Sequence, residues 1–243
     1  MKPIIMSLRN ISKAYKEKGK EIKVLDSISL DIYEDFTAII GPSGSGKSTL
    51  LRIIAGVEKY DSGEIIYHEK VKIGFVFQFP TLLPWMTVLE NVMLPLRASG
   101  INKDEAEAKA RRYLSLVGLH EFEDFYPNEL SGGMKQRVNI ARALATEPTV
   151  LLLDEPFSQL DPLTAENLRS EIMDLWLSGV TSVRSIILVT HNVDEAILMS
   201  DRIVILTPRP AKISKIIDIN IPRPRNRRSS EFQKLEDLIY EYI

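Results

Sequence analysis

Short apolar runs alternate with polar, turn-forming segments along most of this chain, and their lengths predict a mixture of strands and helices. Residues 4–31 alternate apolar and polar positions around a polar turn at 16–20, which predicts a hairpin of half-buried strands. Further strands are predicted at 36–40, 64–67, 71–77, 150–155, 185–190 and 202–207. Helices are predicted at 48–55, 87–97, 103–117, 137–145, 162–177, 192–199 and 231–242. The order of these elements is typical of an α/β fold.

Length and composition narrow the class of protein. The chain has 243 residues, of which 44% are hydrophobic, and this suits one large domain with a substantial core. A net charge of −2 and a pI near 6.0 argue against a protein that coats nucleic acid. The absence of cysteine excludes a disulfide framework and fits a cytosolic location. No apolar run approaches the ~18 residues of a membrane span, and the first residues lack a signal-peptide core, so work at a membrane would require an integral partner.

The segment GPSGSGKST at residues 41–49 fits the phosphate-binding pattern G-x-x-x-x-G-K-[ST] between a predicted strand and a predicted helix. Its glycines let backbone N–H groups turn inward around a polyphosphate, and the helix N-terminus adds partial positive charge. Lys47 would reach the β- and γ-phosphates, and the Ser48 hydroxyl would bind Mg²⁺. A glycine-rich turn with a surface lysine is the alternative, which the flanking elements disfavour. The residues predicted to bind the nucleotide here are Gly41, Pro42, Ser43, Gly44, Ser45, Gly46, Lys47, Ser48 and Thr49.

A second candidate lies where the apolar strand at 150–153 runs into two carboxylates. The carboxyl ends of such strands are where open α/β sheets bind ligands. Asp154 is suited to hold Mg²⁺, and Glu155 is suited to polarise an attacking water. In an extended backbone the two side chains would lie on opposite sides, which separates these tasks. The alternative is a helix cap or a surface turn.

Two further segments carry candidate chemistry. Ser131, Gly132 and Gly133 open the predicted helix that contains 137–145, so their exposed N–H groups form a second anion site. His191 follows the strand at 185–190. A lone histidine at a strand end is more often a surface or capping group, and only the neighbouring motifs raise its interest.

Together these motifs, in this order, resemble the ATPase subunit of an ABC transporter from about Met6 to the C-terminus. The resemblance equates residues 41–48 with the Walker A loop, 151–154 with Walker B, 131–136 with the signature motif and 158–161 with the D-loop. It implies that ATP and Mg²⁺ are bound. It implies catalytic roles for Glu155, His191 and Gln78, and metal binding by Ser48, Gln78 and Asp154. The nucleotide contacts that it adds to the loop are Tyr15, which would stack on adenine, and Ser131, Gly132, Gly133, Gln136 and Asp161.

The resemblance also implies partners. In the family two subunits pack head to tail, so that the signature of each covers the ATP held by the other. We therefore expect a second ATPase subunit in a homodimer, integral membrane permease subunits, and an extracytoplasmic solute-binding protein that acts indirectly. No nucleic acid partner is expected. The implied location is the cytoplasmic face of the cell membrane, with the chain as a peripheral subunit.

The fold that follows is a P-loop NTPase core with a mainly parallel sheet, an N-terminal antiparallel β subdomain and a helical insertion. A single domain over 1–243 is expected, with the core at about 1–82 and 136–220, the helical part at 83–135, and a basic connector with a C-terminal helix at 221–243. Two departures from the family are visible. Gln159 stands where alanine is common, and Glu34-Asp35 where glycine-glutamate is common, although Asp tolerates the turn required there.

Segments outside the nucleotide motifs are similar to the nitrate, sulfonate and taurine branch of ABC importers. They lie at 79–92, 154–157, 190–196, 208–210, 223–225 and 231–232. Leu83-Pro84-Trp85 is either a proline-stiffened loop with a buried tryptophan or a surface that meets a permease helix. The connector at 222–230 is either a solvated linker or a lipid-headgroup contact, and the last helix is expected to pack on its own domain.

Three functions compete on this sequence. The first is the ATPase subunit of an importer of a small polar or anionic solute. The second is a soluble, non-transport ABC-type ATPase that works on nucleic acid or ribosomes, which would usually need two such domains or a long insertion. The third is a P-loop kinase of small molecules, in which the signature at 130–136 and His191 would have no role.

Overall fold

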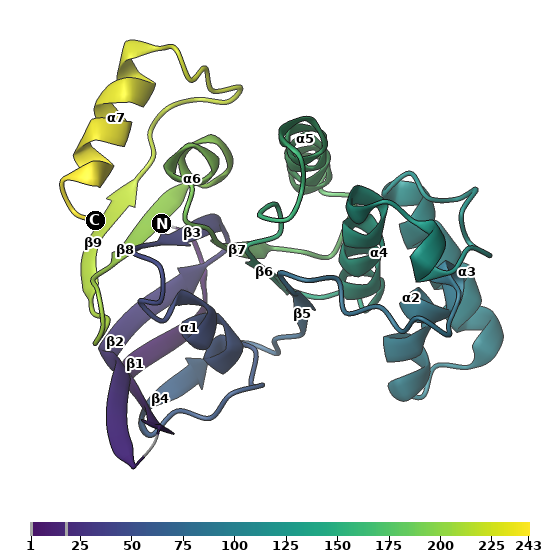
Figure 1. Ribbon diagram of the computed structural model, residues 1–243, viewed down its shortest axis with the longest axis horizontal. Coiled ribbons are helices and arrows are strands. Elements are labelled where there is room, and N and C mark those ends of the chain that lie inside the picture. Colours follow the sequence, from purple (N-terminus) through teal and green to yellow (C-terminus); the bar gives the residue numbers. More distant parts are fainter. Residues whose placement is uncertain (1, 18) are drawn as a thin grey trace. The chain divides into compact units, whose positions relative to one another are not determined.

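The computed structural model describes residues 2–17 and 19–243, which form two compact units. The first unit contains the chain up to residue 71 together with 184–243, and the second contains 72–183. Their elements are labelled in Figure 1. The division predicted from the sequence placed 136–183 with the core, whereas here those residues share a unit with the helical part, so the predicted subdomain limits stay a prediction.

The first unit begins with an antiparallel sheet in the order β2-β1-β4. Its strands are β1 (Ile4–Glu17), β2 (Lys20–Tyr33) and β4 (Ser62–Tyr67). The hairpin predicted from alternating apolar positions is confirmed, with Ile5, Leu8 and Ile11 buried. Lys18 in the predicted turn lies outside the described residues.

A second set of strands in this unit has the order β7-β3-β8-β9. It consists of β3 (Phe36–Ile40), β7 (Ser185–Val189), β8 (Arg202–Leu206) and β9 (Ile213–Asp218). β3 runs parallel to β7 and β8, and all residues of these three strands are buried, which explains why their sequences are mainly apolar. The bend before β3 forms at Glu34 and Asp35, where the Asp35 amide donates to the Tyr33 carbonyl at 2.8 Å. β9 was not predicted, because its residues are mostly exposed and it pairs with β8 in antiparallel register.

The described residues of the first unit also form the helices α1 (Lys47–Ile54), α6 (Val193–Met199) and α7 (Ser230–Tyr240). Phe232 and Ile239 of α7 are fully buried in a cluster with Ala196 and Ile197 of α6 and residues of β3, β8 and β9. The prediction that the last helix packs on its own unit is confirmed (Figure 1).

The second unit joins two parallel strands to four α-helices. Its strands are β5 (Ile73–Val76) and β6 (Val150–Asp154). Its helices are α2 (Val88–Ala98), α3 (Lys103–Leu116), α4 (Gly132–Ala145) and α5 (Pro162–Ser178), with a short 3₁₀ turn η1 (Pro127–Glu129). α2, α3 and α4 pack against one another. Thr87 and Glu90 form a reciprocal cap at the start of α2, which explains why the helix begins at Val88.

The loop between Gln78 and α2 departs from one expectation. Asn91 is fully buried and its side chain binds the backbone of Leu83, Met86 and Thr87 at 2.8–3.2 Å, which fixes the loop. Trp85, however, is 70% exposed. The alternative of a buried tryptophan is therefore wrong, because the polar anchor of this loop is an asparagine and the ring points outward.

The connector before α7 is not a simple solvated linker. Arg223 forms an ion pair with Asp201 at 2.6 Å and donates to the Met199 carbonyl, and Arg225 donates to the carbonyl of Ser200 at 2.5 Å. Two of its arginines thus bind the end of α6, since helix C-termini leave carbonyl groups without intrahelical partners. None of the helices in the described residues is long and apolar enough to cross a membrane.

Candidate functional site

The loop at 41–46 in the first unit has the backbone that its glycines predict. It leaves β3 at Ile40 and enters α1 at Lys47. A Cβ on Gly41 would lie 2.6 Å from the Leu206 carbonyl oxygen, and Gly46 has a φ of 116° and faces Val24 at 2.8 Å. Both positions therefore require glycine, because a side chain would meet the neighbouring strands and the φ of Gly46 favours no other residue.

The loop surrounds the ammonium group of Lys47. Lys47 is 5% exposed, and its Nζ donates to the carbonyl oxygens of Gly41 and Pro42 at 2.9 Å each. The Ser45 hydroxyl is also buried, and its oxygen has no hydrogen-bond partner among the described residues. A buried lysine and an unpartnered buried hydroxyl in one loop fit a ligand with several anionic oxygens. Ser48 and Thr49 lie half-buried in the first turn of α1.

Arg209 contacts this loop, although the sequence did not mark it as a site residue. It lies between β8 and β9, and its Nε donates to the Gly44 carbonyl at 2.5 Å. The flanking Pro208 and Pro210 belong to a segment that is similar to one importer branch, and this similarity gives Arg209 no role. Proline restricts the backbone on both sides of Arg209, which is the signal that could have identified it as a positioned side chain.

His191 is exposed and lies within a hydrogen-bonded turn between β7 and α6. The Thr190 hydroxyl donates to Glu195 at 2.7 Å, the Asn192 amide donates to that hydroxyl, and the Asn192 side chain caps α6 by accepting from the Glu195 amide at 3.1 Å. These bonds fix the backbone on both sides of the imidazole. Tyr15, also in the first unit, lies on β1 and is 37% exposed.

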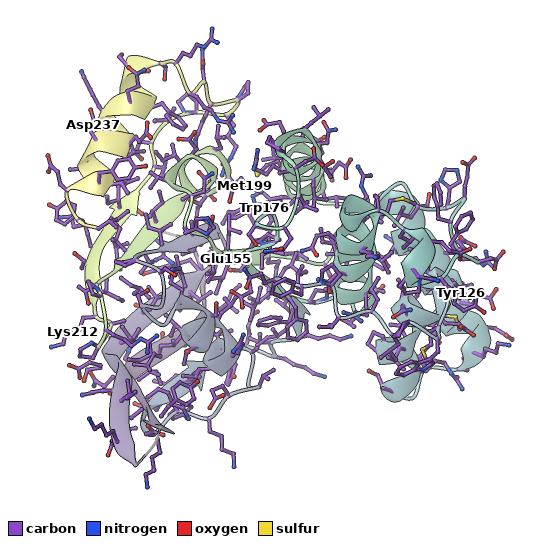
Figure 2. All side chains as sticks on the ribbon, viewed as in Figure 1. Tyr126, Glu155, Trp176, Met199, Lys212 and Asp237 are labelled. Carbon is purple, nitrogen blue, oxygen red and sulfur yellow. The ribbon has the colours of Figure 1, made fainter. Side chains whose placement is uncertain are left out.

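In the second unit the structure brings Gln78 and Glu155 together. The Gln78 Nε2 donates to Glu155 Oε2 and to Ser158 Oγ, at 3.3 Å each, and the Ser158 hydroxyl donates to the Glu155 carbonyl. Glu155 directly follows β6 (Figure 2). Asp154, the last residue of that strand, is 2% exposed.

The expected geometry of the two carboxylates needs a correction. Glu155 has a φ of 45°, so the backbone is left-handed there and not extended. The argument that strand alternation separates Asp154 from Glu155 is therefore wrong. A non-glycine residue in this region costs about 1–3 kcal/mol and persists only where its surroundings enforce it, which is typical of functional positions.

The signature segment opens α4 as predicted, but its last residue, Gln136, contacts the protein backbone. Ser131 caps the helix by accepting from the Met134 amide at 3.2 Å, and Gly132 is exposed at the same helix start. Gln136 is 1% exposed and donates to the Phe77 carbonyl at 3.5 Å. Its observed contact is thus with the backbone before Gln78, and its contact with nucleotide stays a prediction.

Two more predicted residues also have structural tasks. Gly133 is buried, and a Cβ there would lie 2.5 Å from the Thr164 methyl group, so α4 and α5 approach too closely for a side chain. Asp161 caps α5 by accepting from the Thr164 amide at 3.0 Å, and hydrogen bonds from Thr164 lower the pKa of its carboxyl. A cap of this kind needs no ligand, and the role of Asp161 in nucleotide binding stays a prediction.

The residues predicted to bind a metal are better suited to magnesium than to a transition metal. Among the described residues no cluster of three or more His, Cys, Asp or Glu side chains has metal-binding geometry. Mg²⁺ usually takes one or two protein oxygens and completes its shell with water and phosphate. The hydroxyl of Ser48 in the first unit and the carboxylate of Asp154 in the second are each a ligand of that kind, and their binding of one Mg²⁺ stays a prediction.

Comparison with known proteins gives a consistent result. A family model described as ABC transporter matches residues 25–158. The chain is 42% identical over 243 residues to the aliphatic sulfonates import ATP-binding protein SsuB of Bacillus cereus, an alignment that covers 97% of this chain and 94% of that protein. It is 44% identical over 234 residues to an ABC transporter ATP-binding protein of Methanocaldococcus jannaschii, which covers 93% and 86% of the two chains.

A solved structure matches as well. It is a dimeric ATP-binding cassette in a post-hydrolysis state bound to ADP and phosphate. The TM-score is 0.78 at 33% sequence identity, and the match covers 90% of this chain and all of that one.

Proposed function

The chain belongs to the ABC transporter family of ATPases, and from this premise we propose that it powers the import of a small sulfonate-like anion through a membrane permease. The observation that carries the proposal is the near full-length similarity to a sulfonate import subunit. The subunit itself would work at the cytoplasmic face of the membrane and would not touch the solute. A binding protein outside the membrane would deliver that solute to the permease.

An exposed aromatic surface supports the coupling to a permease. Phe79 and Trp85 are 59% and 70% exposed, and both lie in the loop that follows Gln78. Trp85 lies in the part of the loop that Asn91 fixes. An apolar ring on a fixed loop is suited to meet another protein, because little conformational freedom is lost on binding. The loop begins beside the Gln78 side chain that binds Glu155, so it is suited to transmit the state of the catalytic carboxylate.

For ATP binding we propose the loop at 41–49. The Lys47 ammonium would exchange its loop carbonyl partners for phosphate oxygens, and the buried Ser45 hydroxyl would donate to a further one. Tyr15 would stack on the adenine base. Ser48, Gln78 and Asp154 would hold Mg²⁺, which neutralises phosphate charge when it is bound.

For hydrolysis we propose Glu155 as the base that takes a proton from the attacking water. Its carboxylate is held by the Gln78 amide at 3.3 Å, and its left-handed backbone fixes the direction of the side chain. His191 would contact the γ-phosphate and orient the water. Ser131 and Gly133 of a second copy would cover the ATP, since they lie at the start of α4 and a helix N-terminus is suited to bind an anion. The dimeric state of the solved relative supports this arrangement.

One experiment tests the transport function. The chain would be co-expressed with the permease of a sulfonate importer, purified, and reconstituted in liposomes with the solute-binding protein. ATP hydrolysis should rise when an alkanesulfonate is added. Trp85→Ala should weaken co-purification, while Tyr240→Ala, which removes a 59% exposed ring on α7, should not. Failure of the wild-type chain to bind the permease or to respond to sulfonate would refute the proposal.

A second experiment tests the chemistry. Glu155→Gln should lower turnover by about 10²–10⁴-fold, because general-base help is typically worth that factor. ATP binding should persist, and two subunits should stay together in the presence of ATP long enough to be seen by light scattering. Substantial hydrolysis by this variant, without an ATP-dependent dimer, would exclude Glu155 as the base.

A further inference from the structure

Tyr15, the proposed adenine platform, has a buried cation beside it. Lys13 lies two residues earlier on β1, and its Nζ stands over the Tyr15 ring at 5.1 Å from the centroid. Only 10% of the Lys13 side chain is exposed. A cation within about 6 Å of an aromatic ring is attracted by the electrons of the ring face.

Two carboxylates fix the position of this cation. Lys13 Nζ lies 2.8 Å from Glu58 Oε1 and 3.7 Å from Asp61 Oδ1. Asp61 also binds the backbone of β1 on both sides of Lys13. Its Oδ2 accepts from the Ala14 amide at 2.6 Å, and its own amide donates to the Ser12 carbonyl at 2.9 Å. The strand, the ammonium group and the ring are therefore held as one assembly.

The same ion pair connects the ring with the phosphate loop. Glu58 follows α1, and its amide donates to the Arg52 carbonyl in the last turn of that helix at 3.1 Å. The first residue of α1 is Lys47. The Lys13–Glu58 pair thus joins the strand that carries Tyr15 to the helix that starts at the phosphate loop, and these are the elements proposed to hold the two ends of ATP.

Lys13 is not placed to bind the nucleotide directly. Its ammonium is buried and faces two carboxylates, and a phosphate would have to displace them. The hydrogen bond to Glu58 is the main cause that raises the pKa of Lys13 above its usual value, so the group is charged throughout the physiological range.

We propose that Lys13 is a positioning residue that holds the Tyr15 ring as the platform for the adenine base, and so adds to the preference for a nucleotide over a bare polyphosphate. The inference rests on the proposed role of Tyr15. It goes beyond that role because it assigns a function to the Lys13–Glu58–Asp61 cluster, which the nucleotide motifs do not include. Without the Lys13 ammonium the Tyr15 ring has more conformational freedom. Binding of the adenine base then has to fix the ring, which costs affinity.

The test compares a ligand that has the base with one that lacks it. The affinities of the full chain for ADP and for pyrophosphate are measured by isothermal titration, since neither ligand is hydrolysed by an ATPase. Lys13→Met keeps the length of the side chain but removes its charge. It should weaken ADP binding about two- to fivefold, the range of a partly exposed cation–π contact, and leave pyrophosphate binding unchanged. Lys13→Arg should retain most of the ADP affinity.

A double-mutant cycle separates positioning from structure. Tyr15→Ala should weaken ADP binding more than Lys13→Met, and adding Lys13→Met to Tyr15→Ala should cause no further loss. Lys109→Met serves as the control, because Lys109 pairs with Glu105 and Glu147 at 3.5 and 3.2 Å in the second unit. It should leave both ligands unaffected.

The outcomes are distinguishable. If Tyr15→Ala weakens ADP binding but Lys13→Met does not, the inference about Lys13 is wrong while the platform stands. If Lys13→Met weakens ADP and pyrophosphate equally, Lys13 supports the fold and not the base, and the inference is again overturned. If Tyr15→Ala has no effect on ADP, the proposed platform itself fails and the inference fails with it.

Discussion

Arg225 provides a quantitative test of how the C-terminal connector is held. The helix α6 ends at Met199, which is labelled in Figure 2. The last carbonyl groups of a helix have no intrahelical partners. Arg225 Nη1 donates to the carbonyl oxygens of Ile197 and Ser200 and, at 3.4 Å, of Leu198. Its Nε donates to the Ile221 carbonyl at 2.8 Å. One side chain therefore caps most of this helix end.

Arg225→Met removes these donors and keeps much of the apolar stem. A hydrogen bond from a charged group contributes about 1.5–3 kcal/mol net, and water can replace part of the cap because the side chain is only half-buried. We therefore expect a loss of about 2 kcal/mol. For a chain of this size that corresponds to a fall in Tm of about 4–8 °C. Burial and the neighbouring Arg223 lower the pKa of Arg225 to about 10, so the guanidinium is still charged near pH 7.

The assay is thermal unfolding followed by circular dichroism near pH 7. Arg228→Met is the matched control, because Arg228 lies in the same connector and is exposed. Its effect should stay within about 0.5 kcal/mol. Arg225→Lys should fall between the two, since an ammonium is a single point donor. Equal melting temperatures for Arg225→Met and Arg228→Met would refute the capping argument.

Three other predictions follow from single contacts. Burial alone would raise the pKa of Asp201, but the bonds from a backbone amide and from Arg223 lower it. The ion pair between Asp201 and Arg223 therefore stabilises the fold above about pH 4, and this stabilisation is lost as the pH falls through the lowered pKa. Asp201→Asn should reduce the loss of stability in acid, measured by urea titrations at several pH values. Gly133→Ala should destabilise by about 1–3 kcal/mol, and Thr164→Ser in the same chain should restore part of it in thermal melts. Arg209→Met should weaken ADP and pyrophosphate binding equally in titrations, because it holds the phosphate loop and not the base.

The buried strands were the most predictable part of the fold. β3, β6 and β7 are each five residues long and fully buried, and each has only one polar residue, so their sequences are mainly apolar runs with a clear start and end. β9 escaped prediction for the opposite reason. Four of its six residues are exposed, and it exists because β8 offers an edge with which to pair.

The site was predictable in its residue types and less so in its geometry. The glycines and Lys47 lie within one local segment, where spacing alone defines the chemistry. The bond between Gln78 and Glu155 joins residues 77 positions apart, and no local pattern contains it. The left-handed backbone of Glu155 was also missed, because a glutamate has no intrinsic preference for that region and tertiary contacts must impose it.

The connector shows why composition alone misled. A run of arginines and prolines is usually solvated, and charge counts contain no information about acceptors that lie elsewhere in the chain. Here the acceptors are carbonyl groups at the end of α6 and the carboxylate of Asp201. Neither group can be recognised from the connector sequence.

Asp201 also ties this end of the chain to the nucleotide loop. One of its oxygens accepts from Arg223 at 2.6 Å, and the other accepts from the amide of Phe36 at 3.1 Å. Phe36 is the first residue of β3, the strand that leads into Gly41. The helix α6, which begins just after His191, receives its C-terminal cap from the same connector. Since one carboxylate and two arginines hold both elements, changes in the connector should act on the phosphate loop and on the histidine turn through stability, even though the connector binds no nucleotide.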